Sequence, residues 1–347
     1  MLLFKPVKLF PRKHRRMNRW RKNGTMETVV LTLFILMYVI MILRPQVRTY
    51  TALAVAVLFC LLGVVPPGQV LSAIDFNVLM MIAGTMIVVD YFIESRMPNR
   101  IAELLLSRSG NVRTVIILMS LFSGFVSAFI DNVATVLMIA PVGLAICKKL
   151  KINPVGMILS IAVSSNLQGA ATLVGDTTSI MLGNYAKMDF MDFFFMNGKP
   201  GIFWAVEFGA LGTVPVMLFL FRKNRQPVSA DQHTAVESLY PSIMLIGIVV
   251  TLIAASFIPG KPEMTNGIIC CFYAVVCMGI GALREKSLTS AARSVKNLDV
   301  QTLALLAGMF VVIQGLQNTL ADEPGVNVPS RTTPKAVLIG ALCLVLV

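Results

Sequence analysis

Charged residues are scarce in this chain of 347 residues, at 14% against about a quarter in soluble domains. Histidine is scarcer still, since only His14 and His233 occur and neither can anchor a metal site alone. The six cysteines show no CxxC or Cys/His spacing, and the sequence contains no GxxxxGK[ST]. These absences argue against an ordinary soluble domain, a metal cofactor and a built-in ATPase.

Apolar residues, by contrast, make up 56% of the chain, and its mean hydropathy is +0.78. Several apolar runs reach the roughly 18 residues that mark a membrane-spanning helix. The sequence therefore predicts an all-α, multi-pass protein of the cell membrane, with the lipid bilayer as its surroundings. The expected segments are residues 27–43, 49–66, 76–93, 114–130, 133–147, 152–166, 171–186, 200–221, 239–258, 264–283, 300–316 and 336–347.

The net charge of +13 follows the pattern of a membrane protein and not that of a nucleic-acid-binding protein. Nine of the 30 Lys and Arg lie in a basic tail, residues 1–26, which either contacts anionic lipid or is a solvated tail or an upstream extension before a start at Met17 or Met26. Alternate loops carry 16 and 5 basic residues, which places the polar linker 222–238 in the cytoplasm. Counting the membrane crossings back from this linker then places the N-terminus outside. This conflicts with the basic tail, because basic residues favour the cytoplasmic side. Either the tail is not part of the natural product or one span is miscounted.

Asp131 is the only charged residue between Arg113 and Lys148. As one helix, residues 114–147 would be about 51 Å long at about 1.5 Å per residue, whereas the hydrocarbon core is about 30 Å thick. The run must therefore fold back. Asp131 and Asn132 mark the break, because both residue types favour caps and turns over helix interiors. We expect a re-entrant hairpin whose tip lies deep in the membrane.

A second unusual run, residues 152–186, contains Asp176 as its only charged residue. Its centre, SSNLQGAATLVGDTTS at 164–179, gathers Ser, Asn, Gln, Gly, Thr and Asp. Irregular backbone is tolerated at membrane depth only where it packs in protein or lines a cavity. We therefore expect a helix that is broken within residues 164–179.

An internal repeat relates IDFNVLMMIAGTMIVV (74–89) to LDVQTLALLAGMFVVI (298–313) at an offset of 224 residues. An odd number of crossings between the copies inverts the second one, which is the pattern of secondary transporters. The first repeat is then 27–221 and the second is 239–347. The offset places the counterpart of Asp131 eight residues past the end, so the second repeat is expected to be truncated.

Within the two copies, Asp75 aligns with Asp299 and Gly84 aligns with Gly308. Glycines in such helices more often pack against a neighbouring helix than bind a ligand, and we expect this of both. Asp90 and Glu94, near the end of the third segment, are expected at the membrane interface.

The stretches FIDNVATVLMIAPV (129–142) and SSNLQGAATLVGDTTSIMLG (164–183) resemble the ion transporter superfamily of permeases. This group includes arsenite-pump-like, sodium/proton-antiporter-like, P-protein-like and citrate or dicarboxylate carriers. The resemblance covers the chain from about residue 27 to its end. It implies a re-entrant hairpin tip at Asp131-Asn132, a broken helix at 164–179, and a substrate and an ion bound between them.

The second stretch departs in part from the pattern SN-x-GG-x-AT-x-x-GD-PP-N that members of this group usually show. Gln168 and Ala170 differ from it, and Thr177-Thr178-Ser179 replaces Pro-Pro-Asn. These departures leave the transporter class intact and leave the substrate and the coupling ion open.

Two interpretations of the aspartates compete. In the functional one, Asp131 and Asp176 hold Na⁺ or a proton, and the helix N-termini that follow each break face an anionic substrate group. In the other interpretation, the two aspartates cap broken helix ends. The two interpretations can hold at once. The candidate substrate- and ion-binding residues are Asp131, Asn132, Thr135, Ser165, Asn166, Gly169, Thr172, Gly175, Asp176, Thr177 and Thr178, with Asp131, Asn132, Asn166 and Asp176 as Na⁺ ligands.

The favoured function is a secondary carrier, not an enzyme, that couples a small anion (citrate, dicarboxylate or arsenite-like) to a Na⁺ or H⁺ gradient, or exchanges Na⁺ for H⁺. It needs no cofactor beyond the coupling ion, and a homodimer is left open. One alternative is a truncated, inactive carrier. Another is an intramembrane aspartyl protease built on two buried aspartates. The GxGD motif of that family is not met, because residue 173 is leucine.

Overall fold

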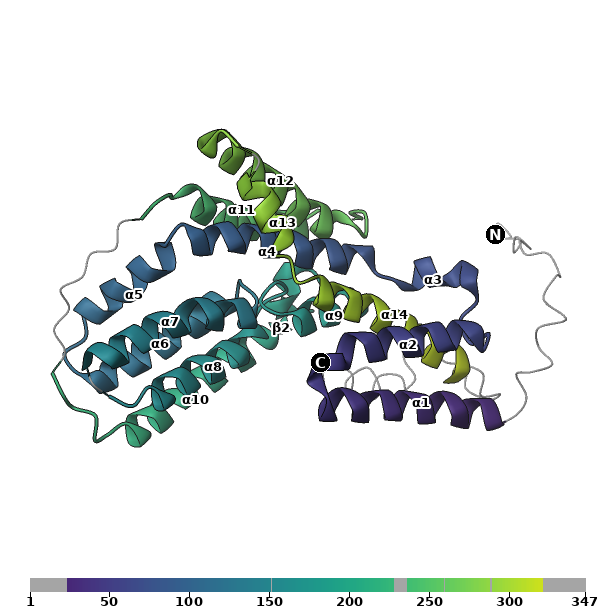
Figure 1. Ribbon diagram of the computed structural model, residues 1–347, viewed down its shortest axis with the longest axis horizontal. Helices are drawn as coiled ribbons and strands as arrows, with labels where there is room; N and C mark the ends of the chain where they lie inside the picture. Colours follow the sequence, from purple (N-terminus) through teal and green to yellow (C-terminus); the bar gives the residue numbers. More distant parts are fainter. Residues whose placement is uncertain (1–23, 151, 228–235, 259, 288, 321–347) are drawn as a thin grey trace, which may run out of the picture. The chain divides into compact units, whose positions relative to one another are not determined.

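A computed structural model shows that, in the part of the chain it describes, the regular secondary structure consists of helices and one two-stranded antiparallel sheet (Figure 1). The predicted all-α class is therefore confirmed. The expected segment 336–347 and nearly all of the basic tail lie outside this part. The structure describes residues 24–150, 152–227, 236–258, 260–287 and 289–320.

Five helices of the described residues are long and apolar enough to cross a membrane, and shorter apolar helices accompany them. Each matches a segment expected from the sequence, which makes the chain a polytopic membrane protein. The five long ones are Met26–Leu43, Phe76–Glu94, Ile202–Leu220, Thr265–Glu285 and Val300–Thr319, and the shorter ones are Pro45–Leu61, Val112–Ser127, Asn132–Lys148, Val155–Gly169 and Tyr240–Ser256.

The chain divides into two compact units that cut across the expected repeats. The first unit takes residues 1–74 and 304–346, so it joins the start of the first repeat to part of the second. Its described elements are α1 (Gly24–Leu43), η2 (Pro45–Val47), α2 (Arg48–Leu61), α3 (Pro67–Ala73) and most of α14 (Val300–Leu320).

Helix α14 packs closely on α2 in this first unit. A methyl group on Gly308 would lie 3.2 Å from the carbonyl carbon of Ala52, so the two backbones nearly touch there. One methyl on Gly315 would lie 2.4 Å from the ring of Phe59. Small residues that let helix backbones approach are typical of membrane proteins, and the packing role expected of Gly308 is confirmed.

The second unit spans residues 75–303. Side chains cap the starts of some of its helices, as when Asp75 at the start of α4 accepts a hydrogen bond from Val78 N at 3.1 Å. Its elements are α4 (Phe76–Glu94), α5 (Met97–Ser107), α6 (Val112–Ser127), α7 (Asn132–Leu150), α8 (Val155–Gly169), α9 (Thr177–Tyr185), η3 (Phe190–Phe193), β1 (Phe195–Met196), β2 (Lys199–Pro200), α10 (Ile202–Leu220), α11 (Tyr240–Ser256), α12 (Thr265–Glu285) and α13 (Thr289–Lys296).

Helices α4, α11 and α12 pack against one another in this second unit. The closest approach is at Gly84, where a methyl group would lie 2.5 Å from the carbonyl carbon of Cys270. Asn77 Oδ1 accepts a hydrogen bond from Gly267 N at 2.7 Å and fixes the register of α4 against α12. Gly84 therefore has the packing role expected of it, against a helix of the other repeat.

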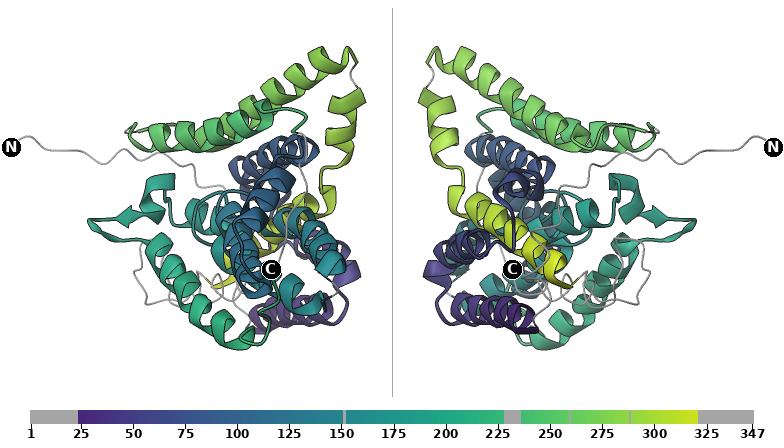
Figure 2. Two further views of the ribbon diagram at one scale, coloured as in Figure 1. Left: turned by 90° about the vertical axis from the view of Figure 1, so that its left-hand side faces the viewer. Right: turned by 90° about the vertical axis from the view of Figure 1, so that its right-hand side faces the viewer.

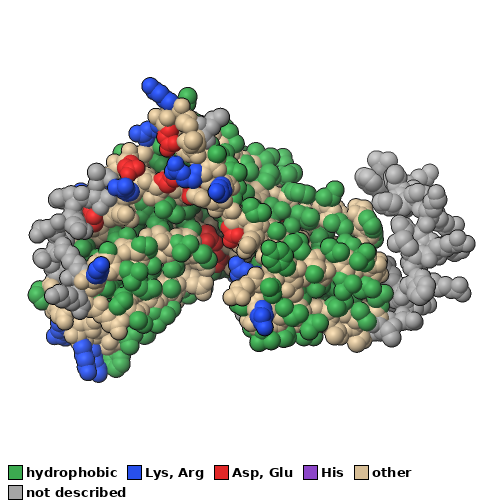
Figure 3. Space-filling model, viewed as in Figure 1, with side chains coloured by type: hydrophobic (Ala, Val, Ile, Leu, Met, Phe, Trp, Pro, Cys, Tyr) green, Lys and Arg blue, Asp and Glu red, His purple; other side chains and the backbone are tan. Residues whose placement is uncertain are grey.

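Helix α8 packs against α6, α7 and α10 and lies at the centre of this group of helices. Its buried residues Met157 and Ile161 belong to one core cluster with Met119 of α6 and Ile139 of α7. Figure 3 shows hydrophobic side chains along the flanks of these helices and Lys and Arg where they end. This is the surface expected of helices that lie in a membrane.

The two described ends of the expected linker 222–238 are held by the rest of the second unit. Val112 N donates to Gln226 O at 3.1 Å, which ties the start of the linker to the start of α6. Near its other end, Glu237 N donates to Ser95 O at 3.1 Å, and Arg96 pairs with Glu237 at 2.9 Å. The middle of the linker, residues 228–235, lies outside the described residues.

Candidate transport site at two helix breaks

The chain folds back between α6 and α7, as predicted from its length. Helix α6 ends at Ser127 and α7 begins at Asn132, so the break consists of residues 128–131. The two helices lie side by side and pack against each other (Figure 1). Asp131 Oδ2 accepts hydrogen bonds from Val133 N and Ala134 N, both at 3.0 Å. Asp131 therefore caps α7, as the second interpretation of the aspartates predicted.

The second break is narrower than expected. Helix α8 continues to Gly169, past the expected segment end at 166, and α9 begins at Thr177, so the irregular residues are 170–176, inside the expected range 164–179. Packing extends α8, because Gly124 of α6 leaves room for the side chain of Gln168. Asp176 caps α9 through a 2.7 Å hydrogen bond from Ser179 N to its Oδ1.

Three hydrogen bonds join the hairpin tip to α8 and to the break that follows it. Asn132 Nδ2 donates to Asn166 Oδ1 at 2.9 Å, and Ser165 Oγ donates to Asn132 O at 3.0 Å. Thr172 Oγ1 donates to the carbonyl oxygen of Ala128. The hairpin tip is therefore fixed both to the last turns of α8 and to the irregular segment that follows them.

Backbone carbonyl oxygens crowd around Gly175 at this junction. A methyl group there would lie 2.3 Å from Gly169 O, 2.8 Å from Ser127 O and 2.9 Å from Ala128 O. One on Gly169 would lie 3.3 Å from Asp176 Oδ2 and 3.4 Å from Ser127 Oγ. Carbonyl and carboxylate oxygens from both breaks thus gather at one place, and glycine at 169 and 175 makes this approach possible.

Three buried hydroxyl groups near the breaks have no hydrogen-bond partner among the described residues. They belong to Ser127 and Thr135, each 0% exposed, and to Ser164, 3% exposed. A buried polar group without a partner costs about 1–3 kcal/mol. Such groups therefore favour a bound water, ion or substrate at this place.

The structure brings most of the residues expected at the site together. Hydrogen bonds join Asn132 to Ser165 and Asn166 of α8, and Thr172 to the hairpin tip. Thr178 Oγ1 donates to Asp176 at 2.7 Å. No hydrogen bond joins Thr177 to the hairpin in the described chain. Sequence reasoning missed Ser127, Ser164, Gln168 and Ser179, for which the small polar residues flanking each break were the available signal.

The structure changes the expectation that the helix N-termini after each break face an anionic substrate group. Each aspartate already accepts hydrogen bonds from the first turn of its own helix, at Val133 and Ala134 and at Ser179. An approaching anion would therefore meet a carboxylate at each helix start in place of free N–H groups. This arrangement suits a cation better than an anion alone.

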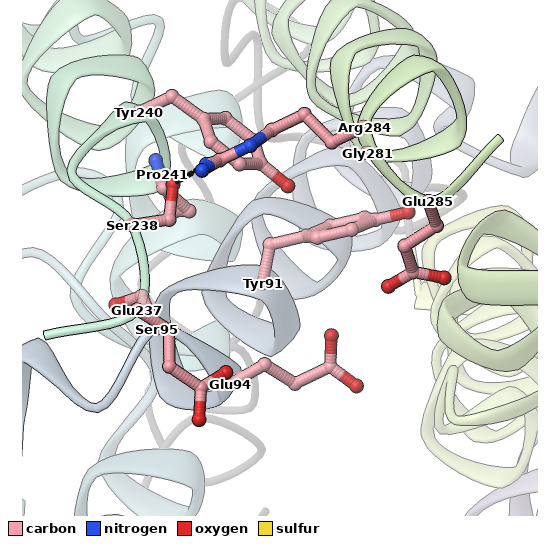
Figure 4. Close-up of a pocket in the computed structure, with 10 residues that line it drawn as sticks. All are labelled: Tyr91, Glu94, Ser95, Glu237, Ser238, Tyr240, Pro241, Gly281, Arg284 and Glu285. Carbon is pink, nitrogen blue, oxygen red and sulfur yellow. Dashed lines mark hydrogen bonds between the residues drawn. The ribbon is translucent and has the colours of Figure 1, made fainter.

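A separate cavity of about 180 Å³ lies where α4 and α12 end and α11 begins (Figure 4). Tyr91 reaches into it, and its hydroxyl group is buried without a hydrogen-bond partner among the described residues. Glu94 at its rim accepts a 2.9 Å hydrogen bond from Arg293, and this contact raises the pKa of Arg293. Ser294 Oγ donates to Asp90 at 2.6 Å, so Asp90 and Glu94 both hold α13 at the end of α4.

Comparison with known families gives a match over most of the chain. The sequence profile of the family described as "Citrate transporter" matches residues 38–347. This range includes both helix breaks and every residue proposed for the site.

Individual relatives are more distant. An uncharacterized transporter of Mycobacterium tuberculosis is 28% identical over 312 residues, which cover 85% of this chain and 69% of the relative. A 46 kDa membrane protein of Mycobacterium leprae is 27% identical over 307 residues, with the same two coverages. The P protein of Sus scrofa is 30% identical over 211 residues, which cover 58% of this chain and 25% of that protein.

Proposed function

Because the chain belongs to the citrate transporter family and is a membrane transporter, we propose that it is a secondary carrier that moves a small carboxylate anion together with a cation. Binding at broken helices between repeats is the usual plan of such carriers. The sequence has no phosphate-binding loop for ATP. An ion gradient is then the energy source.

The observation that carries this proposal is the charge of the junction between the two breaks. Residues 114–147 and 152–186 contain Asp131 and Asp176 and no lysine or arginine. An anion entering here would be repelled by both carboxylates in a medium of low dielectric constant. A cation bound at the same place removes this repulsion, so anion and cation bind best together.

The oxygen atoms around Gly175 supply a place for that cation. The carbonyl oxygens of Ser127, Ala128 and Gly169 lie there, with Asp176 Oδ2 beside Gly169. Hard cations prefer carboxylate and carbonyl oxygens, so Na⁺ fits the cluster, and a carboxylate can instead take up a proton. Of the four Na⁺ ligands expected from the sequence, this set contains only Asp176.

Neutral donors near the cation place suit the carboxylate groups of the substrate. Asn132 and the hydroxyl groups of Ser164 and Thr135 lie on the helices that flank the breaks, and both hydroxyl groups lack a partner in the described structure. We therefore favour citrate or a dicarboxylate as the substrate. The matches are to transporters, and no observation favours the aspartyl protease alternative.

The test is citrate uptake into proteoliposomes under an imposed Na⁺ or proton gradient, for the wild type and Asp176→Asn. Asparagine keeps the cap on Ser179 but removes the charge. A unit charge about 4 Å away is worth about 4 kcal/mol at an effective dielectric constant of 20. We therefore expect coupled uptake to fall by roughly a hundredfold or more with little change in thermal stability.

Asp90→Asn is the control with the same substitution, because Asp90 lies near the end of α4 and accepts hydrogen bonds from Ser294 and Asn297. The same substitution there should leave uptake unchanged. Wild-type rates in Asp176→Asn would show that Asp176 is only a helix cap and would remove the proposed cation place.

A further inference from the structure

Glu207 is a second carboxylate within an apolar helix of the transport unit. It is the only charged residue of α10 and the sixth residue of that helix. Helix α10 is among those long enough to cross a membrane. An ionisable residue inside such a span points to a function unless a partner neutralises it.

Glu207 lies on the face of α10 that turns toward its neighbouring helices. At helical spacing it shares this face with Ala210 and Met217, both buried. The opposite side of α10 carries Phe208 and Val216, which are 70% and 63% exposed. Glu207 itself is half-buried and lies at the edge of the packed face, one turn from the exposed Leu211.

The packing of α10 against α8 fixes the level at which Glu207 lies. Phe221, just past the end of α10, fills the space beside Gly156 near the start of α8. Gly209 faces Leu167, with 3.8 Å between its methyl position and the leucine side chain. The two helices are therefore antiparallel, and continuing this register places Glu207 opposite the last residue of α8, Gly169. Glu207 therefore lies at the height at which α8 ends and the second break begins.

The charged groups around Glu207 do not neutralise it. Helix α8 carries no titratable residue, and α6 carries only Arg113, in its first turn at the far end. The two breaks contain Asp131 and Asp176, both acidic. The chain just before α10 contains Lys199 and two more acids, Asp189 and Asp192. Asp189 pairs with Lys261 at 2.6 Å, and Asp192 accepts a hydrogen bond from the backbone N–H of Asp189.

Glu207 therefore has neither a hydrogen bond nor an ion pair in the described part of the chain. The charged residues of the two breaks, Asp131 and Asp176, are both acidic and cannot neutralise it, so the remaining way is to add a proton. We propose that Glu207 is the proton-binding residue of the transport cycle, which takes up one proton when the break opens to one side and releases the same proton on the other. This inference rests on the carrier function proposed above.

The first test measures the protonation of the Glu207 carboxyl group directly and does not depend on transport. Infrared difference spectra between acidic and alkaline pH are recorded on the reconstituted chain. The carbonyl stretch of a protonated carboxyl group should be present in the wild type and reduced in Glu207→Gln. An unchanged band in this variant would overturn the proposal, because Glu207 would then not bind a proton.

The second test separates coupling from transport. Glu207→Gln should retain citrate exchange across proteoliposomes without a gradient, while the ratio of uptake with and without a proton gradient should fall to about one, because coupling is lost. Glu207→Asp keeps a carboxyl group and should retain part of the stimulation. Glu103→Gln, in the short helix α5, is the control and should behave as the wild type.

The outcomes distinguish the two proposals. Full proton stimulation in Glu207→Gln would overturn the role of Glu207 while the carrier function stands. Absence of citrate exchange in the wild type, with a Glu207-dependent infrared band, would overturn the carrier function for this substrate and keep the proton-binding group.

Discussion

The hydroxyl group of Thr172 donates a hydrogen bond to the carbonyl oxygen of Ala128 and so joins the broken helix to the hairpin tip. The two residues are 44 positions apart in the sequence. Thr172 is 0% exposed, so water cannot replace the bond if it is lost. Three further predictions concern the carboxylate of the hairpin and two glycines.

Thr172→Val should separate the hairpin tip from the broken helix. Valine has nearly the same shape but cannot donate, which leaves a buried carbonyl oxygen without this partner at a cost of about 1–3 kcal/mol. We expect a lower unfolding temperature and reduced uptake, both restored by Thr172→Ser. Thr213→Val is the control, because Thr213 bonds only Ala210 of its own helix. Equal effects at both positions would contradict the joining role.

Asp131→Asn and Asp131→Ala should separate charge from capping. Asparagine caps a helix about as well as aspartate, whereas alanine costs about 0.5–2 kcal/mol. We expect both variants to lose ion-coupled uptake, and only Asp131→Ala to lose thermal stability as well. Membrane insertion should remain intact in Asp131→Asn. If that variant transports like the wild type in proteoliposomes, Asp131 acts as a cap alone.

Gly175→Ala should abolish transport by displacing the carbonyl oxygens around it. Its methyl group would come within 2.3 Å of Gly169 O, so the backbone itself must move. Gly212→Ala, in α10, is the control, because nothing lies within 4 Å of that position. Alanine at an open helical site gains about 0.5–1 kcal/mol over glycine. Retained Na⁺- or proton-driven uptake in Gly175→Ala would rule out the cation place.

Gly84→Ala should destabilise the contact between α4 and α12. Its methyl group would lie 2.5 Å from the carbonyl carbon of Cys270, and overpacking of this kind costs about 1–3 kcal/mol. Gly279→Ala in α12 meets open space and should be neutral or stabilising. Thermal unfolding in detergent measures both. A Gly84→Ala variant as stable as Gly279→Ala would show that the helices do not approach this closely.

Length and polarity predicted the breaks because they are local properties of the sequence. The fold-back near Asp131 follows from a run too long for one crossing, and α7 does begin at Asn132. The end of α8 was misplaced because the side chain of Gln168 fits beside Gly124, a contact that lies 44 residues away in sequence. Polar residues such as Ser165 and Asn166 therefore remain helical despite a composition that favours loops.

Residues whose role depends on a distant partner could not be found from the sequence. Ser127 and Ser164 look like ordinary small residues of apolar helices, and only their burial without a partner marks them. Glu207 is visible as the one charge of its segment, but its level depends on the register of α10 against α8. Short helices such as α13 were missed because few apolar residues mark them.

The cross-packing of the repeats at Gly84 and Gly308 sets an order for synthesis and assembly. Helix α4 is complete at Glu94, but its partner α12 begins at Thr265, roughly 170 residues later. At about 5–20 residues per second, the ribosome needs roughly 10 to 35 seconds to supply it. Helix α2 waits still longer for α14. Newly inserted helices must therefore remain apart in the bilayer or at the translocon before they dock, and neither repeat can complete its packing while the other is missing.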